Sequence, residues 1–370
     1  MLNPLQPLRP ESGHLLHLDA LRLIASAGIV VGHAIVFVDA GPNATWPRAA
    51  QDSLAVFVDM FFVISGFVIA FVYSQKIVDL GSFVQFLRKR LARLAPLHWL
   101  TLGIFIAIGI FARAHHFGPN HDNVYDLDCA PISFFFLNST GLCSHQSFNS
   151  VSWSISAEMM MYLIAPALFW VARRTELGLL AIVILSLAAL AILLPDRSWL
   201  TLTYAGGAFR AIPSFALGIL FYAQRASLAQ SRIARAGFWC GMLGYLAGLV
   251  FGAAQTVLLV ILYATVAFGV GADAQGQSGR FVRMLAAGGQ LTYSSYMLHL
   301  LLIVILLNGV ADRILRSHGL ERDLLVILTF VLVWPVSYLS LMLFERPARK
   351  WLGGRRPRSK PSTVIAAQPK

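Results

Sequence analysis

Long, continuously apolar stretches recur along this sequence and constrain its fold more than any other feature. Each is about twenty residues long, the length at which an α-helix crosses the hydrocarbon core of a bilayer. Membrane β-strands are instead segments of about ten residues in which apolar and polar side chains alternate. We therefore expect an all-α polytopic membrane protein with about ten transmembrane helices. Their expected ranges are 18–38, 54–74, 92–112, 151–171, 177–194, 202–223, 235–251, 254–271, 288–309 and 324–344.

The charge distribution supports this class and predicts an orientation. Only 12% of the 370 residues are charged, whereas a soluble domain has roughly 25%. A net charge of +12 would suggest a nucleic acid partner for a soluble protein, but basic residues of membrane proteins gather in cytoplasmic loops. We therefore expect the lipid bilayer as a partner and no nucleic acid. If the N-terminus is inside, cytoplasmic segments hold 21 of the 29 basic residues, so both termini are expected in the cytoplasm.

Three parts follow from these spans. We expect a cytoplasmic N-terminal segment, a ten-helix membrane domain and a disordered basic cytoplasmic tail, at residues 1–17, 18–345 and 346–370. One long external loop, 113–150, holds Cys129 and Cys143, which could form a disulfide outside the membrane. The chain has neither a CxxC pair nor the spacing of a His/Cys metal site, so no metal is expected.

The first apolar stretch carries an arginine and a histidine. Ionisable groups are costly inside a membrane span and are therefore candidates for a functional site. Arg22 and His33 are eleven residues apart, which places them on one helical face, about 16 Å apart along the axis. Asp19 lies one turn before Arg22 and can pair with it.

Three further spans carry charged residues at a depth similar to that of His33. Counting from the expected helix ends places Asp59, Glu158 and Arg210 in the outer half of the membrane. Exposure of four such groups to lipid is implausible, so we expect them to face a shared polar interior. Two structural alternatives stay open: His33 as a hydrogen-bonded packing residue, and Glu158 with Arg210 as a buried ion pair.

Other polar positions have both a functional and a structural interpretation. A basic cluster formed by Arg88, Lys89, Arg90 and Arg93 opens the third span and could clamp an anionic cofactor, because arginine binds phosphate through two parallel donors. The alternative, which the spacing alone favours, is that it anchors a cytoplasmic loop. His299 could instead form a structural hydrogen bond between two helices. The Ser65-Gly66 pair is typical of close helix packing.

Six motifs occur in order along the chain. They are Arg22 to His33 with ten residues between, VDMFFVISGF at 58–67, Arg90 and Arg93 as RxxR, VSWSISAEMMMYLIAP at 151–166, RAIPSFALG at 210–218 and LTYSSYMLH at 291–299. Together they resemble the membrane-bound acyltransferase family often called acyltransferase-3, which includes bacterial O-antigen and exopolysaccharide O-acetyltransferases. Arg346-Pro347 after Glu345 fits the usual family ending.

The resemblance covers residues 15–350. Met159 and Met161 stand where many members have a second acidic residue and an aromatic residue, whereas Glu158 is kept. This departure concerns the acceptor more than the activity. Larger members carry an additional extracytoplasmic esterase-like domain, and this chain resembles the stand-alone form.

The family implies transfer of an acyl group, usually acetyl, from cytoplasmic acyl-CoA to a hydroxyl of a glycan or lipid-linked saccharide at the bacterial inner membrane. Acyl-CoA, in the first place acetyl-CoA, would be the co-substrate. Its phosphates would lie beside the basic cluster, and its pantetheine arm would pass Arg22 toward His33. The candidate donor-binding residues are Arg22, Arg88, Arg90 and Arg93.

His33 is the candidate general base, because an alcohol is a poor nucleophile until a positioned base takes its proton. Glu158 or Asp59 could orient its imidazole, which makes these three the candidate catalytic residues. Arg210 could neutralise a carboxylate or stabilise the developing oxyanion. An acyl-histidine intermediate and direct transfer both stay open. The candidate substrate-binding residues are Ser65, Trp153, Ser154, Tyr162, Arg210 and His299.

Two other classes of protein place charged groups in membrane spans. A secondary transporter is one alternative, but such proteins often show inverted repeats and helices broken in matching positions. Neither is clear here. A non-catalytic scaffold would leave the buried charges unexplained. Within the enzyme class, the acceptor could also be peptidoglycan or a small hydroxylated metabolite such as a macrolide.

Overall fold

The computed structural model describes residues 15–41, 43–115, 122–194, 198–276 and 278–353, and this part of the chain consists of helices and connecting turns without a β-strand. The α-helices are α1 (Leu16–Ile35), α2 (Trp46–Leu54), α3 (Phe57–Tyr73), α4 (Leu80–Ala114), α5 (Ala130–Phe134), α6 (Trp153–Arg174), α7 (Glu176–Leu193), α8 (Gly207–Ala223), α9 (Arg225–Ala229), α10 (Ala234–Val250), α11 (Gln255–Ala274), α12 (Arg280–Gly288), α13 (Thr292–Ile303), α14 (Gly319–Ser340) and α15 (Arg346–Leu352). π-Helices extend α13 over Val304–Leu315 and α14 over Leu341–Glu345. Single 3-10 turns lie at Asp122–Tyr125, Leu127–Cys129, Ser150–Ser152, Trp199–Thr201 and Gly289–Leu291.

The all-α multi-pass architecture expected from the sequence is confirmed, and each of the ten expected spans coincides with a helix. Within the described residues, eight helical stretches are long and apolar enough to cross a membrane. They are Leu16–Ile35, Trp46–Tyr73, Leu80–Ala114, Ser150–Arg174, Glu176–Leu193, Gln255–Ala274, Arg280–Leu315 and Gly319–Leu352. The apolar helix α8 is shorter, at 17 residues. The number of crossings and the side on which each terminus lies stay predictions.

Helix α4 begins twelve residues before the expected start of the third span. Asp79 caps it: its carboxylate accepts a hydrogen bond from the backbone N–H of Ser82, while the Ser82 hydroxyl lies against the Asp79 N–H. The bond from Ser82 lowers the pKa of the exposed Asp79 carboxyl. Lysine and arginine are good helix formers, so the basic cluster continues the helix instead of opening it. At 35 residues, α4 is about 52 Å long.

Several short helices escaped the sequence analysis, because they lack the apolar length of a span. Helices α2, α9 and α12 lie in segments expected to be connections. The expectation of a disordered tail from residue 346 is wrong for α15, which continues directly from the π-helix that ends at Glu345. Residues 354–370 of that tail, and most of the expected segment 1–17, lie outside the described residues.

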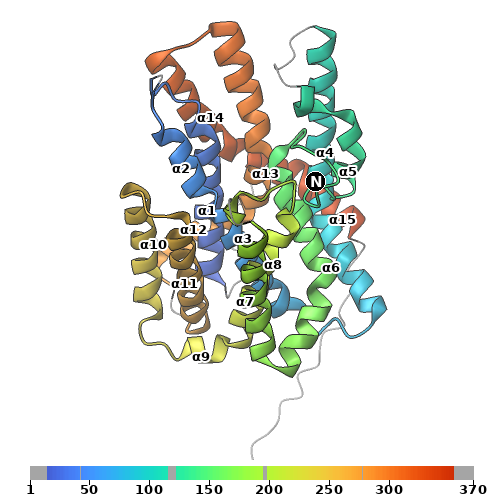
Figure 1. Cartoon of the computed structure of the whole chain (residues 1–370), viewed down its shortest axis with the longest axis vertical. Coiled ribbons are helices and arrows are strands. Elements are labelled where there is room, and N and C mark those ends of the chain that lie inside the picture. Colours follow the sequence, from blue (N-terminus) through green and yellow to red (C-terminus); the bar gives the residue numbers. More distant parts are fainter. Residues whose placement is uncertain (1–14, 42, 116–121, 195–197, 277, 354–370) are drawn as a thin grey trace, which may run out of the picture.

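The long helices run side by side along the bundle (Figure 1). The turns between α3 and α4 and between α6 and α7 lie at one end with α9, at the bottom of the view. These segments carry Lys76, Arg173, Arg174 and Arg225, so we call this the basic end. The end of α4 and the turn before α14 lie at the opposite end. The basic end contains segments that the charge distribution assigns to the cytoplasm.

Helices α3 and α8 pack with their backbones almost in contact. A Cβ atom added at Gly66 would overlap the carbonyl oxygen of Phe215, and one at Gly218 would overlap that of Val63. Only glycine allows this approach, as in the small-residue interfaces of membrane helices. The close-packing interpretation of Gly66 is therefore confirmed, and the contact brings the polar residues of α3 and α8 together.

Candidate active site

Two adjoining cavities lie between the helices that carry the sequence motifs, and we name them inner and outer after the orientation that the charge distribution predicts. The inner cavity, of about 100 Å³, is lined by Arg22, Arg90 and Arg93 together with Ser65, Ser154, Glu158 and Tyr162. The outer cavity, of about 320 Å³, is lined by His33, Trp153 and Arg210. Val58 and Tyr296 line both. Arg22 and His33 thus lie along one series of cavities, in agreement with their predicted common face.

A carboxylate with two hydroxyl donors lies in the inner cavity. Glu158 accepts hydrogen bonds from Ser65 Oγ at 2.6 Å and from Tyr162 Oη at 2.5 Å, both to Oε1. Tyr162 is one turn along α6 from Glu158, whereas Ser65 comes from α3. Because hydrogen bonds to a charged acceptor are strong, this arrangement suits an ionised carboxylate beside the cavity arginines.

Two arginines of the inner cavity, Arg22 and Arg90, are held by neighbouring side chains. Arg22 pairs with Asp19 at 3.5 Å, which confirms the pairing expected from their spacing. Arg90 donates to the hydroxyl of Tyr73 at 3.0 Å, and its guanidinium lies 5.2 Å from the centre of the Tyr73 ring. Arg88 is not among the lining residues. It is exposed and donates to the backbone carbonyl of Leu352 in α15 at 3.1 Å.

His33 has a defined tautomer in the outer cavity. Its Nδ1 lies 2.9 Å from the carbonyl oxygen of Ile29, one turn earlier in α1. A carbonyl can only accept, so Nδ1 carries the hydrogen and the neutral ring keeps a lone pair on Nε2. The backbone of α1 itself, rather than Glu158 or Asp59, therefore orients this imidazole.

A second histidine packs against the first. The ring centres of His33 and His299 are 5.0 Å apart. His299 is fully buried, and its Nδ1 lies 3.0 Å from the carbonyl oxygen of Ser295. Its Nε2 has no hydrogen-bond partner in the described part of the chain. His299 lines neither cavity and contacts the site through His33 and Tyr296.

The buried ion pair joins Arg210 to Asp59, not to Glu158. The Arg210 side chain is 2% exposed and that of Asp59 is 0% exposed. Nε donates to Oδ1 at 3.1 Å and Nη2 to Oδ2 at 2.6 Å. The remaining N–H groups reach three backbone carbonyls, those of Ala55, Leu200 and Leu202. All five guanidinium donors are thus engaged, which supports the charge-neutralising role rather than the oxyanion role.

The four ionisable residues that were expected to face one shared polar interior are therefore divided between two cavities and a buried ion pair. His33 and Arg210 line the outer cavity, Asp59 is sequestered by Arg210, and Glu158 lies in the inner cavity. Trp153 joins the outer group, since the Arg210 guanidinium lies 5.2 Å from the centre of its ring.

The sequence analysis missed three tyrosines at the site: Tyr293 and Tyr296, which line the inner cavity, and Tyr73, which contacts Arg90. Tyr296 lies three residues before His299 and so on the same helical face, a spacing that could have revealed it. Its hydroxyl is 2.6 Å from Ser154 Oγ. For Tyr73, which meets Arg90 across a turn, the sequence offers no such signal.

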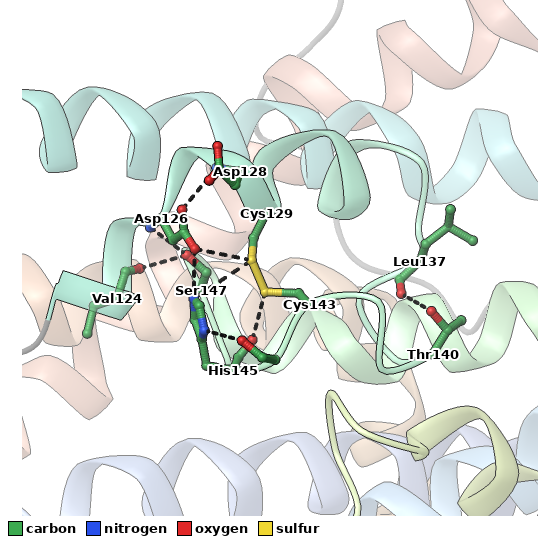
Figure 2. The surroundings of a disulfide bond; sticks show 10 residues. Val124, Asp126, Asp128, Cys129, Leu137, Thr140, Cys143, His145 and Ser147 are labelled. Carbon is green, nitrogen blue, oxygen red and sulfur yellow. Dashed lines mark hydrogen bonds and ion pairs between the residues drawn. A yellow bond between two sulfur atoms is a disulfide. The ribbon is translucent and has the colours of Figure 1, made fainter.

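The loop that holds Cys129 and Cys143, which is expected to be external, is cross-linked beside the outer cavity. Cys129 and Cys143 form a disulfide with a Cα–Cα separation of 5.7 Å, one of the possibilities that the sequence left open (Figure 2). His145 lies close to both sulfur atoms and pairs with Asp126 at 3.1 Å. The sulfur atoms are bonded to each other and are therefore not available as thiolate ligands. Gln146, in the same loop, lines the outer cavity.

Comparison with known proteins identifies the family of this chain. The family model described as "Acyltransferase domain" matches residues 15–344. Acyltransferase MdmB of Streptomyces mycarofaciens is 25% identical over 333 residues, which is 82% of this chain and 83% of that protein. The exopolysaccharide production protein ExoZ of Rhizobium meliloti is 27% identical over 35% of this chain and 39% of its own length.

A further relative, protein 2 in the picA locus of Rhizobium radiobacter, is 30% identical over 40% of this chain and 72% of that protein. No solved structure matches the chain. The family match includes almost every described helix and all residues that line the two cavities. The chain therefore belongs to the acyltransferase-3 family and is a multi-pass membrane acyltransferase.

Proposed function

We propose that this protein transfers an acyl group, in the first place acetyl, from cytoplasmic acyl-CoA to a hydroxyl group of a glycan or lipid-linked saccharide. One observation carries the proposal: an arginine-lined cavity and a histidine-lined cavity adjoin each other at Val58 and Tyr296. Such an arrangement suits an enzyme that receives an anionic donor from one side and a hydroxylated acceptor from the other. The relative named as an exopolysaccharide production protein favours a saccharide acceptor.

The donor side is the inner cavity. Arg90 and Arg93 lie one turn apart on α4, whose start is at the basic end. Their planar guanidinium groups suit the phosphates of acyl-CoA. The cavity is narrow, at about 100 Å³, so it suits the end of the thin pantetheine arm and not the nucleotide. The nucleotide then stays at the surface, where the exposed Arg88 can contribute charge.

The reaction proceeds at Nε2 of His33. This nitrogen takes the proton of the acceptor hydroxyl, whose oxygen bonds to the thioester carbonyl carbon as a tetrahedral intermediate forms. Collapse of the intermediate breaks the C–S bond, and His33 returns the proton to the departing CoA thiolate. The Ile29 carbonyl keeps Nδ1–H in place while the imidazole is charged. The products are the acyl ester and free CoA.

The acceptor side is the outer cavity. Its volume of about 320 Å³ is at the lower end of ligand pockets, which suits one terminal sugar unit rather than a length of polymer. Amide, hydroxyl and carboxylate side chains that can bind sugar hydroxyls line its wall, namely Gln51, Asp52, Gln146, Thr201, Thr203 and Gln255. The ring of Trp153 adds an aromatic surface.

The test is acyl transfer by the purified protein in nanodiscs, with radiolabelled acetyl-CoA and saccharide acceptors. His33→Ala is expected to lower the transfer rate by at least about 100-fold, the usual contribution of a general base. His318→Ala, an exposed histidine at the start of α14, is the matched control and keeps the wild-type rate. Wild-type activity in His33→Ala would overturn the assignment.

The donor role of the basic cluster is tested separately. Arg90→Gln with Arg93→Gln is expected to raise the apparent KM for acetyl-CoA and to leave that for the acceptor unchanged. Arg225→Gln removes a charge from the same end of the bundle but outside the inner cavity, and it should change neither value. Equal effects of both changes would favour the loop-anchoring interpretation of the cluster.

A further inference from the structure

Two residues lie where the inner cavity and the outer cavity adjoin. Val58 of α3 and Tyr296 of α13 are the residues that line both. On one side of them lie the arginines of the inner cavity, and on the other lies His33. The boundary shared by the two cavities therefore lies beside these two side chains.

Tyr296 is a fixed wall at this boundary. Its hydroxyl donates to the carbonyl oxygen of Val151 at 3.0 Å and lies 2.6 Å from Ser154 Oγ. Its ring packs edge-on against Phe61 and His299, with centre separations of 6.3 and 5.9 Å. Rotation of the ring away from the boundary would break both hydrogen bonds inside the protein, where they are costly to lose.

Val58 is a fixed wall for a different reason. A valine in a helix has one strongly preferred rotamer, so its two methyl groups cannot easily turn away. The next residue, Asp59, is held by Arg210, and Gly66 holds the same helix against α8. Both contacts restrain helix α3, so Val58 keeps its position at the boundary between the cavities.

We propose that Val58 and Tyr296 form a constriction that selects the acyl group by its cross-section. This inference rests on the proposed function, because it takes an acyl thioester as the group that passes. The acyl group enters first, and the thioester carbonyl then reaches His33 while the pantetheine arm stays in the inner cavity. A straight acyl chain has the width of one methylene group along its length. A chain branched next to the carbonyl presents two methyl groups side by side and meets Val58.

The sharpest pair of donors is n-butyryl-CoA and isobutyryl-CoA, which have equal numbers of carbon atoms and differ in width. Wild-type protein in nanodiscs is expected to prefer the n-butyryl donor at least about 10-fold in kcat/KM, the lower range for one misplaced methyl group in an apolar pocket. Val58→Ala removes both methyl groups and is expected to bring the ratio close to one. Val72→Ala, on the same helix but lining neither cavity, is the control and keeps the wild-type ratio.

Val58→Ile narrows the space beside Tyr296 instead of widening it, and it provides a second test if the alanine variant does not fold. The added methyl group is expected to lower the use of n-butyryl-CoA relative to acetyl-CoA. Ratios equal to those of the wild type in both variants would overturn the constriction and leave acyl transfer intact. A folded wild-type protein that uses no acyl-CoA of any shape would instead overturn the proposed function, and the constriction with it.

Discussion

Removal of the buried ion pair between Asp59 and Arg210 has a cost that can be worked out from its contacts. Asp59→Asn keeps one oxygen for the guanidinium but leaves a buried cation uncompensated, which costs about 3 kcal/mol of unfolding free energy. Arg210→Met leaves the Asp59 charge and also removes the donor to the carbonyl oxygens of Leu200 and Leu202. We expect that change to cost about 5 kcal/mol, the upper end for a broken buried pair.

The double variant distinguishes a coupled pair from two independent residues. Asp59→Asn with Arg210→Met removes both charges, so the remaining loss comes from the Leu200 and Leu202 carbonyl groups, at about 1 kcal/mol each, because the Ala55 carbonyl still accepts the Val58 N–H. The expected loss of unfolding free energy is therefore about 2 kcal/mol, although the two single losses sum to about 8 kcal/mol. The coupling of about 6 kcal/mol is well above the roughly 0.5 kcal/mol by which distant residues deviate from additivity.

The unfolding free energies can be measured by SDS titration of the protein in mixed micelles. The eight tryptophans provide the fluorescence signal. Asp312→Asn is the matched control: Asp312 pairs with Arg322, but its side chain is 40% exposed, so its loss should cost no more than about 1 kcal/mol. Additive losses in the double variant would refute the reasoning, since they would mean that the pair does not stabilise the fold as a unit.

Two further predictions concern the external loop and the contact between α3 and α8. Maleimide labelling of denatured protein without reductant is expected to modify Cys240 alone, and labelling of Cys143 in the unreduced wild type would contradict the disulfide. Cys129→Ser is expected to lower the free energy of unfolding by about 3 kcal/mol, as for the loss of a disulfide that closes a loop of about 15 residues. Gly66→Ala is expected to lower the melting temperature, because the new methyl group overlaps a carbonyl of α8, whereas Gly103→Ala has open space and should not. Equal melting temperatures for both variants would contradict the close contact.

Some of the site could be predicted because it depends on distances along one helix. The rise and twist of an α-helix place Arg22 and His33 on a common face, and they place Asp19 beside Arg22. Both placements agree with the structure. The ten helical segments could be predicted for a similar reason. About twenty apolar residues in a row can satisfy their backbone hydrogen bonds inside a bilayer only as a helix.

The partners of the charged groups could not be predicted in this way. Counting residues from a helix end estimates depth in the membrane, but not which helix is the neighbour or which face it presents. His33, Asp59, Glu158 and Arg210 were therefore expected in one band, whereas the structure pairs two of them and assigns the other two to different cavities.

Length, apolarity and helical periodicity act locally, so the amino-acid sequence alone determines the helical membrane class and the common face of Arg22 and His33. The pairing of Asp59 with Arg210, the division into two cavities and the constriction between them depend on helices far apart in the chain. They arise only when the glycine contact of α3 with α8 and the placement of α13 bring these helices together, since side chains from separate helices meet only through packing.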